Sequence, residues 1–491
     1  MGQSTNDLMA VNLPHEPREY MCTWHLPKAV QDSDEDQLVD VPGTIDLTGR
    51  HHPTASFQGI LPYASDSGRA RFPQTKNFNC LTGTLPSGIH VALLNGQMSY
   101  WFHNNGGAKG AFALLSIRPF EHGNYRKYQS IELQIDGLET IVDEAPTTIE
   151  FTKRTDEHDE SYKISIPTQN TIDWRNQDSR MRLGYAGRLR PDRFNFRTSF
   201  APYLRIDIEE PISLADWWLR WVVPLCDILE VINGKPLDIM YLLAFEDKDA
   251  TGSKRRADQV FRYDIRQDCI KIDEKRFNHT RAIVNLKQDN INLLNLIAKR
   301  RELEASRHPL IETYRSNAVS DDQHPRSRFL LLIQALEGLY GYEHKEEYQQ
   351  RCRKYAEKRK ALLDQVQPSI VDQDDFNFLK NNFSRRPLSG LRDALNATFR
   401  TLPEAVQTQI DGSEIVAQVR SRCENTKISS AEALTKVRNS LSHGSSAYDP
   451  NDLEKICAIL HKIVRAEILR VLDLPDVARE RMLEARFGRE H

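Results

Sequence analysis

The sequence lacks the cysteine patterns of a zinc-binding or disulfide-stabilised protein. Its seven cysteines are odd in number and widely scattered, and no two of them form a Cys-X2-Cys pair. This distribution provides neither the usual zinc-ligand spacing nor the framework of a small secreted domain. It is typical of a protein in a reducing compartment. We therefore predict a cytoplasmic protein that uses no metal ion and no other cofactor.

Long apolar runs are also missing. The most apolar stretch, residues 217–232, contains Arg220, Asp227, Glu230 and a proline, so it is too polar to cross a bilayer. The N-terminus has no basic segment followed by an apolar one, as a secretory signal would require. Asn6 breaks the myristoylation pattern that would begin at Gly2. These absences predict a protein with no membrane partner.

The sequence contains no strong excess of one charge and no common nucleotide-binding or hydrolase motif. The formal net charge is −3, so contact with RNA would have to come from local basic patches. The N-terminal half has no phosphate loop, no nucleophile elbow and no zinc-protease pattern. With 491 residues and no internal repeat, the chain is long enough for two or three domains.

Residues 1–285 are dominated by the sequence signature of β-strands. In 131–135 and 204–208, apolar and polar residues alternate, which predicts a sheet with one solvent-exposed face. Many short strands with turn residues between them favour a sandwich or barrel-like recognition domain. The predicted strands cover residues 43–47, 89–94, 98–102, 111–117, 130–135, 148–151, 162–166, 203–208 and 260–265.

One helix interrupts this β-rich half. Ser213 and Asp216 have the spacing of a capping box, and Gly234 follows the last turn. Pro224 falls inside the helix and is expected to kink or split it. The helix is apolar nearly all round, which indicates burial. We therefore assign its three tryptophans to the core rather than to a base-stacking surface, at positions 217, 218 and 221.

After residue 285 the pattern becomes helical. Residues 286–327 are predicted to form a connecting helix and a linker, and residues 328–491 a helical bundle. Glu337 lies on the apolar stripe of a helix over residues 328–342. Its carboxylate either reaches solvent at the helix edge or orients Arg438 on a facing helix. The candidate RNA-binding cations are Lys436, Arg385 and Arg386.

A short helix at residues 429–444 has both ends marked in the sequence. Ser429 precedes Glu432 by three residues, which is again the capping-box spacing. Gly444 follows the last turn, where a left-handed residue ends a helix. The apolar stripe of this helix consists of Leu434, Val437 and Leu441.

The last turns of the same helix carry Arg438, Asn439 and His443. A permanent cation, a carboxamide and an imidazole are together suited to binding and cleaving a phosphodiester. Residues five apart are separated by about 140° around a helix, so Arg438 and His443 do not share a stripe. Fraying at Gly444, or a second copy of the helix, would bring them to one cleft. In the alternative interpretation the two side chains only cap the helix C-terminus.

The segment Arg-Asn-Ser-Leu-Ser-His-Gly, at residues 438–444, resembles the Arg-X4-6-His motif of HEPN domains. The whole arrangement is similar to the Apea-like HEPN group of bacterial abortive-infection proteins. The early strand at residues 42–47, before a long β-rich region, is similar to the N-terminal domain paired with that group. The resemblance implies an α+β protein in which a β-rich N-terminal domain precedes an all-α HEPN bundle.

The resemblance also implies a function. It predicts a metal-independent endoribonuclease that cleaves RNA, with tRNA as one candidate, to 2′,3′-cyclic phosphate products in anti-phage defence by abortive infection. His443 would then move the proton, Arg438 would stabilise the developing charge, and Asn439 would position His443 or a phosphate oxygen. A homo-oligomer would form a composite site, and a phage-derived trigger would act on the N-terminal domain. The alternative function is a non-catalytic HEPN module that dimerises and binds nucleic acid or a partner protein.

Overall fold

The computed structural model contains two compact units. Unit 1 comprises residues 1–229 and 237–297, and unit 2 comprises residues 230–236 and 298–491. Strands dominate the chain up to Phe261 and helices follow from Leu293, so the predicted α+β class is confirmed. The structure describes residues 13–27, 38–59, 75–102, 105–142, 146–153, 160–165, 172–191, 196–247, 257–268, 282–317, 323–370, 372–384, 390–423, 427–444 and 447–484.

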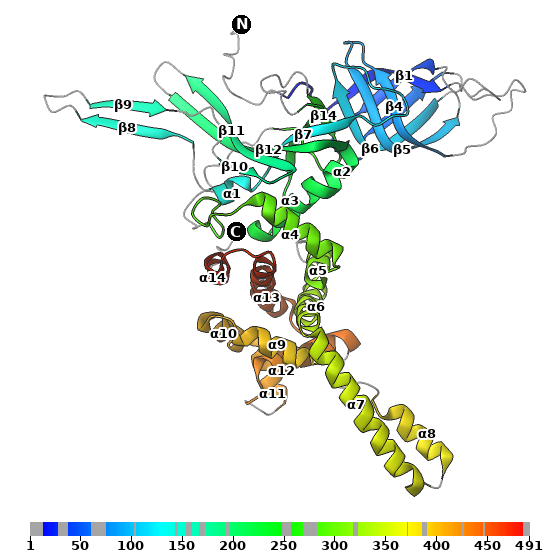
Figure 1. Ribbon diagram of the computed structural model, residues 1–491, viewed down its shortest axis with the longest axis vertical. Coiled ribbons are helices and arrows are strands. Elements are labelled where there is room, and N and C mark those ends of the chain that lie inside the picture. The colour runs from blue at the N-terminus through cyan, green and yellow to red at the C-terminus, as the bar shows by residue number, and fades with distance from the viewer. Residues whose placement is uncertain are drawn as a thin grey trace, which may run out of the picture. The chain divides into compact units, whose positions relative to one another are not determined.

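Six of the described strands in unit 1 form a closed antiparallel barrel, drawn in shades of blue in Figure 1. They pair in the order β6-β3-β2-β1-β4-β5, and β5 pairs again with β6 to close the ring. The predicted strands at 89–94 and 98–102 are one continuous strand, β5. The barrel strands are β1 (Glu19–Pro27), β2 (Leu38–Asp46), β3 (Thr54–Gln58), β4 (Lys76–Thr84), β5 (His90–Phe102) and β6 (Asn105–Ser116).

Alternation along the strands fills the barrel interior. In β1, the alternate residues Cys22, Trp24 and Leu26 are buried. Met21, which lies out of phase with them, is 62% exposed. The Trp24 ring contacts Phe57 edge-on, with ring centroids 5.7 Å apart. Only glycine fits at position 43, because a Cβ there would lie 1.9 Å from the carbonyl oxygen of Ser56 on β3. The packing of the barrel core therefore depends on the alternation of inward- and outward-facing side chains, and on the close approach of the β2 backbone to β3 at Gly43.

Strand β6 joins the barrel to an open sheet. Its residues 105–109 pair with β3, and residues 113–115 pair with β14. From β14 the sheet continues through β13, β7, β12, β11 and β10, and β8 and β9 form a separate hairpin. These strands are β7 (Lys127–Ile135), β8 (Thr148–Lys153), β9 (Glu160–Ser165), β10 (Ile172–Arg175), β11 (Ser179–Pro191), β12 (Phe196–Ser213), β13 (Ile239–Phe245) and β14 (Asp258–Phe261).

The prediction of one solvent-exposed face was wrong for this sheet. Glu132 and Gln134 on β7 and Asp207 on β12 are buried. Strand β7 lies between β12 and β13, and β13 is buried along its whole length, so both faces of the centre are covered. The buried carboxylates have partners on neighbouring strands: Arg182 is 2.5 Å from Asp207, and the Tyr241 hydroxyl donates to Glu132 at 3.2 Å.

The interrupting helix has the predicted ends and an altered middle. The Ser213 hydroxyl accepts from the Asp216 N–H, and Gly234 has a φ of 75°. Helix α2 (Leu214–Trp217) passes through a π-helical turn, residues 218–222, into α3 (Val223–Asn233). Pro224 has no N–H to donate, and the wider turn just before it accommodates this break in the hydrogen-bond ladder. The three tryptophans are buried, which confirms their assignment to the core.

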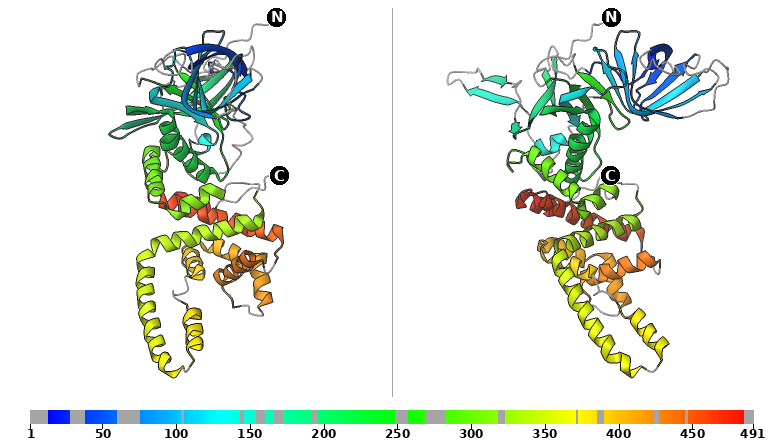
Figure 2. Two further views of the ribbon diagram at one scale, coloured as in Figure 1. Left: turned by 90° about the vertical axis from the view of Figure 1, so that its right-hand side faces the viewer. Right: turned by 45° about the vertical axis from the view of Figure 1, so that its right-hand side comes forward.

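Unit 2 is built around the long helix α13, which packs against α6 and α14. Helix α6 also contacts α5, α9 and α12. The α7–α8 hairpin extends away from the other helices of this unit (Figure 2). The helices are α4 (Leu293–Ala305), whose first residues belong to unit 1, α5 (Pro309–Asn317), α6 (Pro325–Glu343), α7 (Lys345–Val366), α8 (Gln373–Asn382), α9 (Leu391–Arg400), α10 (Glu404–Asp411), α11 (Glu414–Arg422), α12 (Ser430–His443), α13 (Pro450–Val471) and α14 (Asp476–Glu484).

Helix α13 buries polar side chains as well as apolar ones. Arg465 is 1% exposed and donates to the carbonyl oxygens of Val231 and Ile232 at 2.6 and 2.5 Å, which places residues 230–236 in unit 2. His461 is also buried, and its Nε2 lies 3.0 Å from the Tyr314 hydroxyl. These contacts fix the helix by directional bonds in addition to hydrophobic burial.

Acid is expected to destabilise unit 2 through His461. Burial, with the charges of Arg465 and Arg328, lowers the pKa of His461 from 6.5 to about 3. Between these two values the unfolded chain binds a proton that the folded chain does not, so the free energy of unfolding falls by about 1.4 kcal/mol per pH unit as the pH decreases. Denaturation followed by far-ultraviolet circular dichroism at about pH 7 and about pH 5 measures this slope.

His461→Gln serves as the comparison, because glutamine still accepts from Tyr314 but does not titrate. We expect the variant to be less stable at neutral pH and to have a shallower pH dependence below about pH 6.5. An unchanged slope in the variant would assign the acid sensitivity to another group.

Candidate active site

The motif helix α12 has the ends that the sequence predicts. The Ser429 hydroxyl accepts from the Glu432 N–H at 3.2 Å, and Gly444 has a φ of 67°. The carboxylate of Glu432 lies 3.5 Å from Arg392 on α9. The apolar stripe is buried as predicted, at Leu434, Val437 and Leu441. The helix is therefore regular up to His443, and its polar face points away from the core.

Lys436, Asn439 and His443 share that polar face. They follow each other at intervals of three and four residues, and all three are exposed. The buried apolar residues on the opposite face pack against α6, α9 and α11. An imidazole and a carboxamide on one open stripe are accessible to a large ligand such as a nucleic acid strand.

Arg438 lies at the border of the open stripe and turns toward α6. Its Nη2 is 3.4 Å from Oε2 of Glu337, and its Nη1 donates to Oδ1 of Asn439 at 3.2 Å. The side chains of Arg438 and Glu337 are 37% and 31% exposed. The structure thus brings Glu337 to Arg438 as one of the two sequence interpretations expects. The pair is half-buried, so it lacks the strong desolvation of a fully buried ion pair.

His443 lies in the last turn of α12 and is separated from this pair. Among the described residues, no hydrogen bond or ion pair joins His443 to Arg438. Arg326, at the start of α6, donates to the carbonyl oxygen of Leu441 and holds the last turn of α12 in place. Within one chain, the arginine and the histidine therefore face different directions, as their spacing predicts.

The candidate RNA-binding cations are only partly described. Lys436 is exposed, and its Nζ lies 3.7 Å from the sulfur of Cys423. Arg385 and Arg386 lie outside the described residues. Their predicted contact with RNA stays a prediction.

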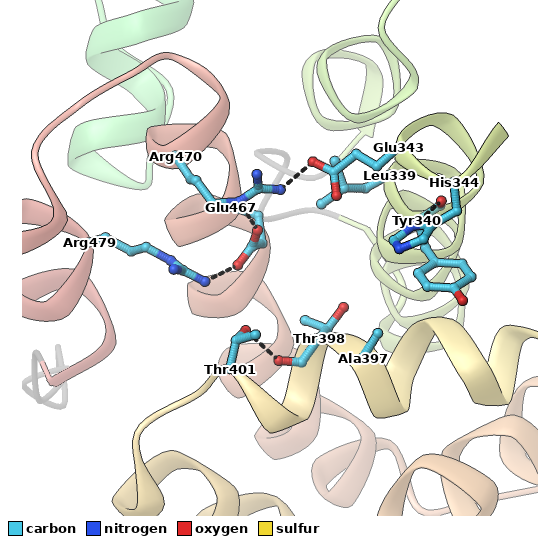
Figure 3. Close-up of a pocket in the computed structure, with 10 residues that line it drawn as sticks. All are labelled: Leu339, Tyr340, Glu343, His344, Ala397, Thr398, Thr401, Glu467, Arg470 and Arg479. Carbon is cyan, nitrogen blue, oxygen red and sulfur yellow. Dashed lines mark hydrogen bonds and ion pairs between the residues drawn. The ribbon is translucent and has the colours of Figure 1, made fainter. Parts of the chain in front are cut away.

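A cavity of about 380 Å³ opens between four helices of unit 2 (Figure 3). Residues of α6 form one side, the C-terminal half of α9 forms another, and arginines of α13 and α14 lie opposite the α6 residues. The lining residues are Leu339, Tyr340, Glu343, His344, Ala397, Thr398, Thr401, Glu467, Arg470 and Arg479. Its size is that of a site for a small ligand or part of a larger one.

A chain of ion pairs crosses one wall of this cavity. Arg470 lies 2.6 Å from Glu343 and 2.7 Å from Glu467, and Arg479 lies 2.5 Å from Glu467. Burial alone would lower the pKa of Arg470, but its hydrogen bonds with both carboxylates outweigh burial and raise it. The Nε atom of Arg479 is buried and has no hydrogen-bond partner in the described structure.

The sequence analysis missed these cavity residues. Glu467 and Arg470 stand three apart on α13, and Glu467 occupies a core position between Ala466 and Ile468. A carboxylate on an apolar stripe is the signal that selected Glu337. Applied to α13, the same rule would have selected Glu467.

Two other kinds of site are absent from the described part of the chain. No three His, Cys, Asp or Glu side chains there gather as a metal ion would require. None of the helices described is both long and apolar enough to cross a bilayer.

Comparison with known proteins identifies the N-terminal part of the chain. Residues 22–300 match the family model of ApeA N-terminal domain 1, which is more than half of the 491 residues. The matched range begins within β1, contains the rest of the barrel and the open sheet of unit 1, and ends before α12. Neither the curated proteins nor the solved structures gave a match.

The predicted resemblance is therefore confirmed for the N-terminal domain, and it associates the chain with anti-phage defence. The resemblance of the C-terminal helices to HEPN domains stays a prediction. On the extent of the match, the chain belongs to the family defined by ApeA N-terminal domain 1.

Proposed function

We propose that this protein is a metal-independent endoribonuclease of the HEPN type that acts in anti-phage defence by abortive infection. The observation that carries the proposal is the arrangement on α12: an exposed His443 in the last turn of the helix, and an Arg438 that Glu337 and Asn439 hold. An exposed site on a convex helix face suits a polymer substrate better than a small molecule, which would need an enclosing pocket.

RNA supplies its own nucleophile, so the protein needs only to move protons and stabilise charge. The 2′-hydroxyl oxygen forms a bond to phosphorus as His443 accepts its proton, and the bond from phosphorus to the 5′ oxygen breaks. Arg438, which is always charged and fork-shaped, stabilises the extra negative charge on the phosphoryl oxygens. A second protonated imidazole or water returns a proton to the leaving oxygen. The products are a 2′,3′-cyclic phosphate and a 5′-hydroxyl.

Incubation of the purified protein with total RNA in excess EDTA tests this proposal. Fragments with 2′,3′-cyclic phosphate ends are expected from the wild type. If no RNA is cleaved under any condition, with or without phage components, the alternative function is favoured. That alternative is a non-catalytic HEPN module that dimerises and binds nucleic acid or a partner protein, in which Arg438 and Glu337 only form a contact between α12 and α6.

The N-terminal domain is proposed to sense a phage-derived trigger. Its match covers residues 22–300, and a separate sensing unit would explain how a cell tolerates a ribonuclease until infection. RNA cleavage is then expected to rise when a phage lysate is added to the full chain. Equal activity with an uninfected lysate would argue against a trigger.

The active site is proposed to be composite, built from two copies of the chain. Since Arg438 and His443 face different directions in one chain, two α12 helices meeting across a two-fold axis would place the arginine of each near the histidine of the other. We expect mixed Arg438→Ala and His443→Ala subunits, each inactive alone, to recover up to about half of the wild-type activity per hybrid dimer. Recovery is measured after co-expression with two different tags and tandem purification. Full RNA cleavage by a protein that light scattering shows to be a monomer would contradict the composite site.

Glu337 is proposed as a positioning residue for Arg438. Glu337→Gln keeps the shape and removes the charge, so we expect kcat to fall by about tenfold with little change in KM. The free energy of unfolding should change by less than about 1 kcal/mol, because the pair is half-exposed. Glu337→Asp should recover part of kcat. Normal kcat in Glu337→Gln would restrict the carboxylate to a structural contact.

A further inference from the structure

The cavity in unit 2 lies next to the Arg438–Glu337 pair along α6. Glu337, Tyr340 and His344 follow each other at three and four residues, so they share one face of α6 and its end. Tyr340 and His344 line the cavity, and one helical turn is about 5 Å. The cavity therefore begins about one turn from the residue that holds Arg438, which is a distance comparable to one nucleotide of an RNA strand.

The walls of the cavity offer three different kinds of contact. The rings of Tyr340 and His344 stack with centroids 4.1 Å apart on the α6 side, and the arginines lie on the opposite side (Figure 3). Between them, the hydroxyls of Thr398 and Thr401 donate to helix carbonyls at 3.0 and 2.8 Å. Their oxygens remain able to accept a hydrogen bond. A ring platform, hydroxyl oxygens and guanidinium groups match a base, a ribose 2′-hydroxyl and a phosphate.

The ion pairs in the cavity determine which phosphate fits. Glu467 is buried between two arginines, whereas Glu343 is 37% exposed at the end of α6 and is free to turn to solvent. An incoming phosphate that replaces Glu343 would face Arg470, Arg479 and Glu467, whose charges sum to +1. A phosphodiester carries a single negative charge and balances this sum, whereas a terminal phosphate carries up to two.

We propose that this cavity is a subsite for one nucleotide of a single-stranded RNA, with its base on the Tyr340–His344 pair and its phosphodiester on Arg470 and Arg479. The inference rests on the proposed function, because it takes the bound strand to be the substrate. It adds a binding residue set on α6, α9, α13 and α14 to the reactive groups on α12. It also assigns a role to Glu343 as the carboxylate that the strand displaces.

The test uses the full-length His443→Ala protein, so that bound RNA survives, and a fluorescein-labelled 12-nucleotide RNA followed by fluorescence anisotropy. Tyr340→Ala removes one ring of the platform and is expected to weaken binding by about tenfold, the loss of one stacked base. Tyr342→Ala is the matched control, because Tyr342 is also on α6, is 43% exposed and contacts the His308 ring at a tilt of 58° outside the cavity. The control should bind within about twofold of the parent protein.

Glu343→Gln tests the phosphate contact independently of the ring platform, and its expected effect on RNA affinity is opposite to that of Tyr340→Ala. Removing the competing carboxylate should tighten RNA binding by about threefold, which corresponds to the free energy of one exposed ion pair. Because Glu343 is exposed, the variant is expected to stay folded even if Tyr340→Ala does not. Unchanged or weaker RNA binding by Glu343→Gln would overturn the displacement argument and with it the subsite.

Competition experiments identify the ligand chemistry. The dinucleoside monophosphate ApA is expected to displace the labelled RNA at lower concentration than AMP or inorganic phosphate, and the deoxy analogue d(ApA) should compete less well than ApA. If AMP competes as well as ApA, the cavity binds a free nucleotide and the strand subsite is overturned. If none of them displaces the labelled RNA although unlabelled 12-nucleotide RNA does, the cavity is not the binding site.

These results separate the subsite from the proposed function. If the wild type cleaves RNA but Tyr340→Ala and Glu343→Gln bind RNA as tightly as the parent protein, the subsite is overturned. The ribonuclease assignment is then unaffected. Binding that depends on the cavity, without cleavage by the wild type, would support the subsite and remove the ribonuclease assignment.

Discussion

Replacing His443 with alanine is expected to lower RNA cleavage by about 10²- to 10⁴-fold, the usual contribution of a positioned proton acceptor. Arg438→Ala is expected to lose about 10²- to 10³-fold, because it removes the charge that stabilises the phosphorane. If both residues act in one step, the double variant should lose little more than the worse single variant. Rates are measured on a labelled RNA under single-turnover conditions.

The same variants are expected to fold normally. His443 is exposed at the end of α12 and Arg438 is 37% exposed, so neither contributes a buried side chain to the core. Arg392→Ala is the matched control: this arginine is 59% exposed and forms a comparable 3.5 Å ion pair with Glu432. It should keep activity within about twofold. Activity retained by both His443→Ala and Arg438→Ala would exclude the catalytic assignment, and a large loss of stability in either would favour a structural role.

Replacing Asp258 with alanine is expected to destabilise unit 1 by about 3–5 kcal/mol, because the partners stay buried and lose their acceptor. Asp258 lies on β14, where the barrel meets the open sheet, and its side chain is fully buried. It accepts from the Tyr128 hydroxyl and from Nη1 of Arg126, each at 2.7 Å. Burial and the adjacent carboxylate raise the pKa of Tyr128 well above its usual value, so the tyrosine remains a donor.

Tryptophan fluorescence during chemical denaturation measures this loss selectively. All six tryptophans of the chain lie between positions 24 and 221, within unit 1. Asp258→Asn keeps an acceptor for Tyr128 but removes the charge beside Arg126. Its free energy of unfolding should therefore lie between those of the wild type and Asp258→Ala. Asp40→Ala is the control, since Asp40 is 70% exposed in its pair with His25 and should cost less than about 1 kcal/mol. If Asp258→Ala and Asp40→Ala have the same free energy of unfolding, the buried carboxylate does not stabilise the junction between the barrel and the open sheet.

Local sequence signals predicted the features that depend on nearby residues. The caps at Ser213, Ser429 and Gly444 are found where their spacing placed them, because a cap is closed by groups within about four residues. The buried stripe of α12 follows for the same reason. The β-rich half was recognised from its short alternating runs, although alternation did not reveal whether the second face of a sheet is covered.

The candidate site was predicted as a set of residue types and not as an arrangement. Arg438, Asn439 and His443 were selected from one helix, and helical geometry alone showed that the arginine and the histidine diverge. The contact between Arg438 and Glu337 joins residues 101 positions apart, so the sequence could offer it only as one of two interpretations. Glu467 and Arg470 were missed, because their partners come from other helices.

The sequence by itself determined the α+β class, the helix ends and the composition of the motif, since these follow from interactions between neighbours along the chain. Only the tertiary structure decided that β5 returns to β6 to close the barrel, and that Glu132 and Gln134 are covered on the second face. It also decided that four helices enclose the cavity in unit 2. Burial and charge pairing depend on which elements meet in space, and no local pattern specifies the partner that arrives from a distant part of the chain.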